Sequence, residues 1–286
     1  MNKFVKSMLA VAATAAMLAP AVASTTIDGV KFNPGTQFIT TALWEKTLLN
    51  STDSLEGVGI VNKISCSGCG GQTWSDGNNN TQLTYYFSGF AVSKWLDVSG
   101  NWHNAGDEGA GLNSFANAKN LVFSGGSVKL FTDRVTTGTY LDPSANPNVV
   151  NPALIAQDIA NATDGNLWLS YAGKNTFDVL TGQTGSLFAS AGTFNNVHAG
   201  GAGFGYLDVV GGMAALPFNT DSWNVLGTIA DARFDSSYSN TNGGAWPLSG
   251  TASFKTASKL PEPGSMALVA VALVGLGAAG RRTKKQ

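Results

Sequence analysis

The chain has 286 residues, of which 12% are charged and 43% hydrophobic, with 35 glycines and a formal net charge of −1. This low charge content and high glycine content favour a turn-rich β protein over a helical bundle. Six of the 17 basic residues but only one of the 18 acidic residues lie in the two terminal segments, so the body between them carries a formal charge of −6. An acidic body does not favour nucleic acid or an anionic membrane surface as a partner.

The first 23 residues have the pattern of a secretory signal peptide. Two lysines precede an apolar run over residues 8–19, and Ala21-Val22-Ala23 supplies the small residues that signal peptidase requires. The apolar run is short and ends at Pro20, which disfavours a permanent membrane helix. We therefore expect residues 1–23 to be removed before Ser24.

Short β-type segments recur along residues 24–260, separated by turns rich in Gly, Asn and Asp. Residues 76–80 are expected to form a tight turn, residues 124–127 a hairpin turn or a bulge within one strand, and residues 234–244 a mobile loop. The expected strands cover Val58–Ile64, Leu83–Phe90, Leu121–Phe123, Val128–Phe131, Leu167–Tyr171, Tyr206–Val210, Ile229–Phe234 and Ala252–Lys259.

One helix is predicted over residues 151–160. Asn151 can act as its N-cap and Pro152 suits the first helical position, while Leu154, Ile155 and Ile159 form one apolar face. We expect this helix to cap an open end of the sheet structure. Many short strands with one helix predict a single all-β domain over residues 24–260, namely a β-sandwich of jelly-roll type.

Cys66 and Cys69 are the only cysteines, in a chain with an export signal. A local disulfide is the favoured interpretation, because oxidising compartments remove free thiols. A redox-active pair is disfavoured by the surrounding glycines, which oppose the helix start that such sites use. A zinc site would need both His103 and His198 in addition, at spacings unlike those of zinc fingers.

No recognisable catalytic set occurs in the sequence. It contains no Gly-x-Ser-x-Gly elbow, no His-Glu-x-x-His and no P-loop. The adjacent Asp107 and Glu108 suggest a glycosidase pair, but adjacent residues on a strand point to opposite faces, so a solvated surface explains them better. Calcium binding by residues 76–80 lacks the EF-hand spacing. We therefore predict no catalytic residues, no metal and no cofactor.

Tryptophan residues are the best candidates for contact with a ligand. Exposed Trp rings stack on sugar rings while nearby Asn and Asp side chains bind hydroxyl groups. Trp95 and Trp168 lie in strand-like runs and are expected in the core. Trp74 and Trp102 lie beside polar residues in expected loops, and they are predicted to bind glycan.

The last 26 residues form a third recognisable segment. Pro261-Glu262-Pro263 precedes an uncharged span over residues 264–280, and a basic tail over residues 281–286 follows. At 1.5 Å per residue the span reaches roughly 25 Å, close to the ~30 Å hydrocarbon core of a bilayer. Clustered positive charge stays on the cytoplasmic side, so the body is expected outside. The basic residues of the tail are Arg281, Arg282, Lys284 and Lys285.

This order of motif, span and basic tail resembles the PEP-CTERM sorting domain of Gram-negative bacteria that make exopolysaccharide. The resemblance covers under a tenth of the chain and rests on Pro261, Glu262 and Pro263 with the span and tail. It implies recognition by an exosortase, a membrane-embedded cysteine peptidase that cuts near the motif. A simple tail anchor is the plain alternative. A sortase signal is disfavoured, because residues 260–264 lack the threonine at which sortases cut.

The body also resembles PEP-CTERM proteins associated with flocculation, through the segments GVGIVNKI, QLTYYFSGF, FSGGSVKLFTD and DGNLWLSYAG. The resemblance implies an exported, non-catalytic protein of the cell surface or extracellular matrix. Its expected partners are signal peptidase, exosortase and exopolysaccharide, with the inner membrane as a transient anchor before processing. The rival hypothesis is a secreted carbohydrate-active enzyme of glycoside hydrolase type.

Overall fold

A computed structural model describes residues 24–46, 48, 53–69, 71–107, 118–134, 152–194, 197–240 and 246–259. The protein is an all-β fold, as the sequence predicts, and residues Thr25–Lys259 form one compact unit. Most of its strands belong to one antiparallel sheet.

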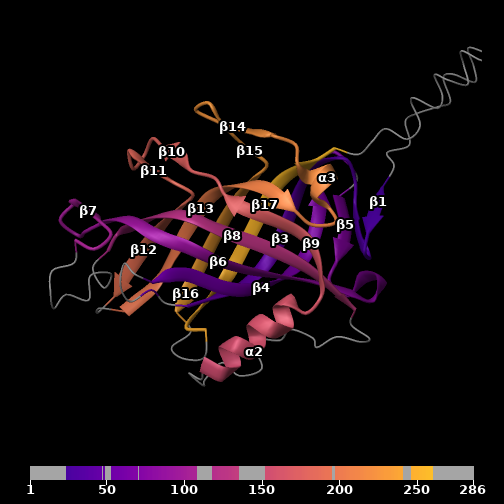
Figure 1. The fold of residues 1–286 in the computed structure, drawn as a ribbon, viewed down its shortest axis with the longest axis horizontal. Coiled ribbons are helices and arrows are strands. Elements are labelled where there is room, and N and C mark those ends of the chain that lie inside the picture. Colours follow the sequence, from indigo (N-terminus) through magenta and orange to yellow (C-terminus); the bar gives the residue numbers. More distant parts are fainter. Residues whose placement is uncertain are drawn as a thin grey trace, which may run out of the picture. The chain divides into compact units, whose positions relative to one another are not determined.

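Within the described ranges this sheet closes into a barrel of eight staves that follow one another in chain order (Figure 1). The staves are β3 (Gly35–Glu45), β4 (Ser54–Cys66), β6 (Thr81–Leu96), β8 (Asn120–Arg134), β9 (Asn166–Gly173) with β12 (Leu187–Phe194), β13 (Val197–Gly211), β16 (Ala232–Asn240) and β17 (Leu248–Ser258).

The closed barrel corrects the predicted β-sandwich. The first and last staves pair along their whole length, from Gly35 opposite Ser258 to Glu45 opposite Leu248, so the sheet has no free edge at this seam. Closure satisfies the backbone groups that an open sheet leaves unpaired. The partners lie more than 200 residues apart, so no local pattern in the sequence could announce their pairing.

One stave is made of two pieces. β9 pairs with residues 127–132 of β8, and β12 then continues in the same direction beside residues 120–123. Between them the chain leaves the wall as a hairpin of β10 (Thr176–Asp178) and β11 (Gln183–Gly185). Ser186, just before β12, restores the pairing with β8, because its N–H donates a hydrogen bond to the carbonyl of Phe123 at 2.8 Å.

Smaller elements decorate the barrel. β1 (Thr25–Ile27) pairs with β2 (Val30–Phe32), and β14 (Trp223–Val225) pairs with β15 (Thr228–Ala230). β5 (Gly71–Ser75) pairs with the end of β4, and β7 (Trp102–Asn104) pairs with the end of β6. A short helix α3 (Ala215–Phe218) and the 3-10 turn η1 (Asn78–Asn80) complete the set.

The predicted helix is present as α2 (Pro152–Thr163), but it does not cap an end of the barrel. It lies outside the wall, where its apolar side chains pack around Val58 of β4 (Figure 1). Trp246 joins this cluster, and its indole N–H donates to Asp158 of the helix at 2.8 Å. The cluster also contains Trp44, Ile60, Tyr86, Leu154, Ile155, Ile159 and Ala162. The strand members of the cluster point outward from the barrel, and the helix shields them from solvent. They are Trp44, Val58, Ile60 and Tyr86.

The barrel interior follows the two-residue period of its strands. Along β3 every second residue from Gln37 to Glu45 is buried. Large rings of β6 fill the space beside the glycines of the neighbouring strand β4. A Cβ on Gly57 would lie 2.3 Å from the Phe87 ring, and a Cβ on Gly59 would lie 2.2 Å from the Tyr85 ring. Ring and glycine are therefore complementary, and a side chain at either glycine would overpack the core.

An aromatic plug closes the barrel end where β3 and β9 begin. Phe32 of β2, Trp168 of β9 and Phe218 of α3 are fully buried, with ring centroids 4.9–6.2 Å apart. Aromatic pairs at such spacings add to the stabilisation that burial gives. We call this the plugged end. At the opposite end, where β3 finishes at Glu45, the interior contains a cavity, and we call this the cavity end.

Buried Asp231 holds the outer layer of the plugged end. Its carboxylate accepts hydrogen bonds from the backbone N–H groups of Val209, Thr220 and Asp221, at 2.7, 2.6 and 2.7 Å. These donors belong to β13 and to the segment that follows α3. One carboxylate therefore fixes the chain that crosses this end of the barrel.

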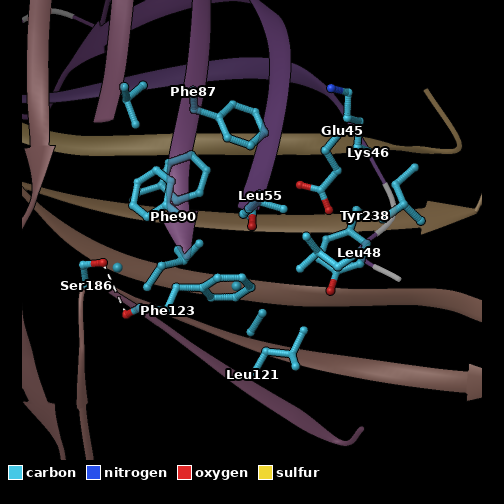
Figure 2. A pocket seen from close by; sticks show the side chains of 18 of the residues that line it. Glu45, Lys46, Leu48, Leu55, Phe87, Phe90, Leu121, Phe123, Ser186 and Tyr238 are labelled. Atoms are coloured by element: carbon cyan, nitrogen blue, oxygen red, sulfur yellow. Dashed lines mark hydrogen bonds between the residues drawn. The ribbon is translucent and has the colours of Figure 1, made fainter. Parts of the chain in front are cut away.

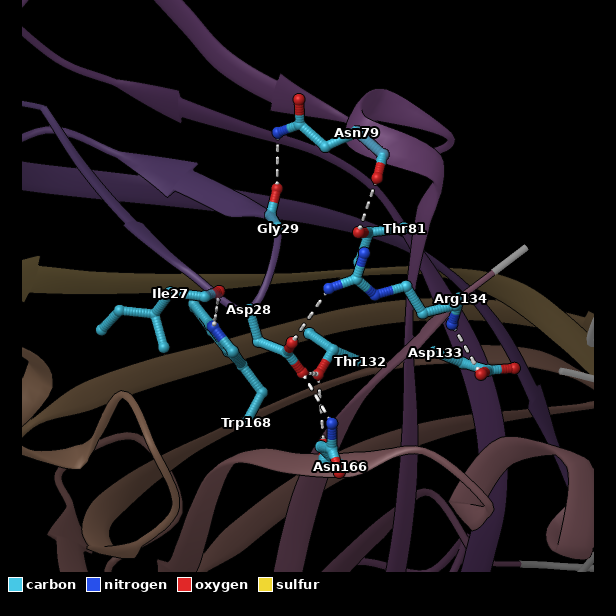
Figure 3. A network of polar contacts seen from close by, with 10 residues as sticks. All are labelled: Ile27, Asp28, Gly29, Asn79, Thr81, Thr132, Asp133, Arg134, Asn166 and Trp168. Atoms are coloured by element: carbon cyan, nitrogen blue, oxygen red, sulfur yellow. Dashed lines mark hydrogen bonds and ion pairs between the residues drawn. The ribbon is translucent and has the colours of Figure 1, made fainter. Parts of the chain in front are cut away.

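Asp28 ties the N-terminal hairpin to the same end (Figure 3). Its carboxylate accepts hydrogen bonds from the Thr132 hydroxyl and, at 3.0 Å, from the Asn166 amide, and Arg134 lies 4.0 Å away. Asp28 and Gly29 form the tight turn between β1 and β2, with φ of 47° and 84°. Such a turn needs left-handed residues, for which Asp-Gly is well suited.

Most predicted strands are confirmed, with one correction. Of the two alternatives for residues 124–127, the single strand is correct: they lie within β8, where Gly125 and Gly126 have φ of 67° and 86°. The correction concerns the predicted mobile loop. Residues 234–240 of the predicted mobile loop belong to β16, which places Phe234 inside the barrel. Ser237 and Ser239 occupy exposed positions of this strand, so polarity alone is a poor sign of a loop.

Candidate functional site

The cavity end encloses a space of about 50 Å³ within the barrel (Figure 2). This is several times the roughly 10–15 Å³ that one water molecule needs. Side chains from β3, β4, β6, β8, β12, β13, β16 and β17 line it, together with two glycines of β13. The lining is Glu45, Lys46, Leu48, Leu55, Phe87, Phe90, Leu121, Phe123, Val128, Ser186, Leu187, Ala189, Gly203, Gly205, Leu207, Phe234, Ser236, Tyr238 and Leu248.

The glycines of β13 explain why space remains here. Gly203 and Gly205 occupy inward positions of the strand and contribute no side chain to the interior. The glycine-rich run over residues 200–205 lies within strand β13. Close packing holds for Gly205, where a Cβ would lie 2.5 Å from the carbonyl oxygen of Ser186.

Glu45 is the one acidic side chain in the described lining of this cavity. It is the last residue of β3 and only 5% exposed. No described residue donates a hydrogen bond to its carboxyl group or forms an ion pair with it. Burial without a partner disfavours the charged form and raises the pKa of Glu45 to about 8.

The nearest basic side chain serves a different carboxylate. Lys46 follows directly after the end of β3 and points away from the Glu45 carboxyl group, toward Glu56 of β4, with which it pairs. Tyr86 donates a further hydrogen bond to Glu56 at 2.6 Å. Burial acts to raise the pKa of Glu56, but these hydrogen bonds and the lysine charge outweigh it and lower the pKa. Lys46 and Tyr86 thus favour the charged form of Glu56, and no described residue does the same for Glu45.

Tyr238 of β16 lies beside Glu45 at the cavity (Figure 2). Its hydroxyl donates a long hydrogen bond of 3.4 Å to the carbonyl of Ser190. Burial, assisted by the negative charge of Glu45, raises the pKa of Tyr238. The cavity therefore combines one unpartnered carboxyl group and one phenol with walls of Phe and Leu.

Of the two tryptophans predicted to bind glycan, Trp74 is excluded. It is fully buried at the plugged end, where β5 pairs Trp74 with Ile64 of β4. A ring with no accessible face cannot stack on a sugar. The polar sequence around it suggested a loop, but Trp74 instead points inward from a strand.

Trp102 remains accessible. It lies half-buried on β7, opposite Leu96, in the hairpin that extends β6 beyond the barrel wall (Figure 1). Asn101 and Asn104 on either side are exposed. The predicted combination of an aromatic face with neighbouring amide groups is therefore present at Trp102.

His103 on the same hairpin has a structural environment. Its ring stacks on Trp95, with centroids 4.2 Å apart, and its Nε2 lies 3.0 Å from the Asp97 carboxylate. The His103 contact, followed by the backbone N–H of Asn101, lowers the pKa of Asp97. His103 thus braces the hairpin that carries Trp102.

The remaining predicted residues are not brought together. Within the described ranges no three His, Cys, Asp or Glu residues lie close enough to hold a metal ion. His198 lies on strand β13 rather than in a loop. Asp107 accepts a hydrogen bond from the backbone N–H of Asn104, and its expected neighbour Glu108 lies outside the described residues.

Cys66 and Cys69 are joined by a disulfide in the structure. The bridge closes the turn between β4 and β5, and the Cys69 carbonyl accepts a hydrogen bond from the Asn33 side chain at 3.1 Å. This position at the plugged end indicates a structural staple. Its presence in exported protein stays a prediction, which peptide mapping under non-reducing conditions can check.

The signal peptide and the sorting segment lie outside the described residues, and so does the predicted span over residues 264–280. None of the helices in the ranges that are described combines the length and apolar composition needed to cross a membrane. The sorting motif Pro261, Glu262 and Pro263 and the basic tail therefore stay predictions from the sequence.

Comparison with known proteins yields no relative. No family model, no curated protein and no solved structure matches this chain.

Sequence reasoning missed Glu45 as a site residue, although a signal was present. Ile39, Leu43 and Glu45 share one face of an alternating strand, because side chains two residues apart point the same way. A carboxylate in phase with buried aliphatic residues is a candidate for an interior polar group.

Proposed function

We propose that this chain is an exported, exosortase-processed protein of the cell surface or extracellular matrix that associates with exopolysaccharide without cleaving it. The observation that carries the proposal is the order of Pro261-Glu262-Pro263, apolar span and basic tail behind a signal peptide. The half-exposed Trp102 and its flanking amides on the β6–β7 hairpin supply a surface suited to sugar rings.

The rival glycoside hydrolase needs a pair of carboxyl groups across the scissile bond. The described lining of the barrel cavity provides a single one, Glu45. No observation favours the enzyme over the binding protein, so hydrolysis enters as an outcome of the test.

Two measurements test the proposal. In the producing host, intact mass of the surface protein should show an N-terminus at Ser24 and loss of the tail from Arg281 onward; a retained tail in an exosortase-positive host would contradict processing. Deletion of the gene should weaken floc or biofilm cohesion while polysaccharide is still secreted.

The binding surface is tested by Trp102→Ala, with Leu180→Ala as the matched control. Leu180 is 89% exposed at the tip of the β10–β11 hairpin, so its truncation also removes an exposed apolar side chain. Loss of a well-used aromatic contact should weaken binding to the host polysaccharide by about 1–2 kcal/mol, whereas the control should bind normally. Equal binding by both variants would remove Trp102 from the proposal, and release of reducing sugar would favour the enzyme.

A further inference from the structure

The cavity end offers a second site, independent of the glycan-binding hairpin. Ligand sites are typically concave and apolar, with a few convergent polar groups that fix orientation. The cavity has that composition, because aromatic and aliphatic side chains surround the carboxyl group of Glu45 and the phenol of Tyr238 (Figure 2).

Glu45 is the informative residue, because a buried polar group without a partner is costly and rare. At the plugged end, Asp28 and Asp231 accept two and three hydrogen bonds. Glu45 accepts none from the described residues, and Lys46 is committed to Glu56. A ligand group that donates hydrogen bonds and carries a positive charge would supply the partner that the Glu45 carboxylate lacks.

The aromatic walls suit the rest of such a ligand. Phe87, Phe90 and Phe123 border the cavity and offer an apolar surface to a hydrocarbon body. A carboxylate together with such rings suits an ammonium group attached to an apolar body. A ligand carboxylate would meet repulsion from Glu45, and a plain hydrocarbon would leave Glu45 as it is.

We propose that the cavity end of the barrel binds a small organic amine, with its ammonium group on the Glu45 carboxylate and its apolar body among Phe87, Phe90 and Phe123. A space of about 50 Å³ limits the enclosed part of the ligand to a few atoms. Short aliphatic monoamines are therefore the class that fits.

The test uses three probes of equal chain length: n-butylamine, n-butanol and butyrate. Each is titrated into the purified full chain near pH 8.5, where Glu45 carries its charge and the amine is still protonated. Binding is followed by calorimetry and by the carboxyl carbon shift of Glu45 in NMR spectra. Butylamine should bind at least about tenfold more tightly than butanol, as expected for a hydrogen bond to a charged group.

Glu45→Gln is the decisive variant and Asp235→Asn its matched control, because Asp235 bears a half-exposed carboxylate on the same barrel, paired with Arg233 and outside the cavity lining. Glu45→Gln should weaken butylamine binding about tenfold or more and leave butanol binding unchanged, whereas Asp235→Asn should bind like the parent.

The proposal is overturned if butanol or butyrate binds as tightly as the amine, if none of the probes binds, or if Glu45→Gln binds butylamine normally. Should Glu45→Gln fail to fold, the parent protein alone decides: butylamine must shift the Glu45 carboxyl resonance, and butanol must not. None of these outcomes depends on processing or glycan binding, so the two proposals fail separately.

Discussion

The two ends of the barrel differ in how many hydrogen-bond donors surround their enclosed acidic groups. At the plugged end, Asp231 is surrounded by three backbone donors and Asp28 by a hydroxyl, an amide and a guanidinium group. At the cavity end, Glu45 is nearly as buried as Asp231 and more buried than Asp28, yet it receives no hydrogen bond from the described residues. The same sheet thus uses carboxylates to fasten one end and keeps an unpartnered carboxyl group beside open space at the other.

The difference follows from what covers each end. The plugged end is covered by β2, β5 and α3, and its two carboxylates receive donors from β8, β9, β13 and the segment that follows α3. At the cavity end, the described strands simply finish, and small residues of β12 and β13 leave room. A buried carboxylate therefore stabilises the fold where hydrogen-bond donors surround it. Where no donor is near, it is a candidate for a ligand-binding group.

The largest expected effect breaks the plugged end. Asp231→Ala leaves three buried N–H groups without an acceptor and should lower the free energy of unfolding by about 5 kcal/mol, measured by urea denaturation. Asp235→Ala, four residues further along the chain, removes only a half-exposed partner of Arg233 and should cost less than about 1 kcal/mol. Similar losses in the two variants would show that Asp231 is not the fastening group.

Glu45→Gln should raise the free energy of unfolding at high pH, whereas Asp231→Ala lowers it. The pKa of Glu45 is higher in the folded chain than its ordinary value, so the folded state binds the proton more tightly. Stability should therefore fall as the pH rises from about 4.5 to about 8, and stay level above that. Removal of the titrating group should raise the free energy of unfolding at pH 9 by about 3 kcal/mol and change it little at pH 5. A pH-independent difference between variant and parent would contradict this.

Asp28→Asn sharpens the contrast with a smaller change. The hydrogen bond from Thr132 lowers the pKa of Asp28 despite partial burial, with smaller contributions from Asn166 and Arg134. Its stabilisation is therefore present above the unfolded pKa and lost as the pH falls through the folded pKa. The variant should cost about 1–2 kcal/mol at pH 7 and progressively less in acid, followed by urea denaturation across the pH range. A loss that grows toward acid would reverse the assigned sign.

The sequence predicted the strands well because their signals are local. Alternation and turn chemistry are sufficient to place β6, β9 and β13, and capping with apolar spacing is sufficient to place α2. The architecture was predicted wrongly because closure depends on the pairing of β3 with β17, between residues at opposite ends of the body. The position of α2 likewise depends on which outward strand residues are apolar.

The candidate site was less predictable for a related reason. Trp74 and Trp102 have similar polar neighbours in the sequence, yet one is buried on β5 beside β4 and the other lies on an exposed hairpin. Glu45 could have been placed inside from its phase with Ile39 and Leu43. That it lacks a partner follows only from the three-dimensional arrangement, since Lys46 next to it serves Glu56.

The most direct test of the contrast between the two ends is an NMR titration of the carboxyl carbon of Glu45 in the purified full chain. We predict an inflection at about pH 8, well above the ordinary value near 4.5, with Glu56 titrating below its ordinary value in the same spectra. Titration of Glu45 near pH 4.5 would show a solvated or partnered carboxylate, and would contradict the unpartnered buried group on which the cavity end depends.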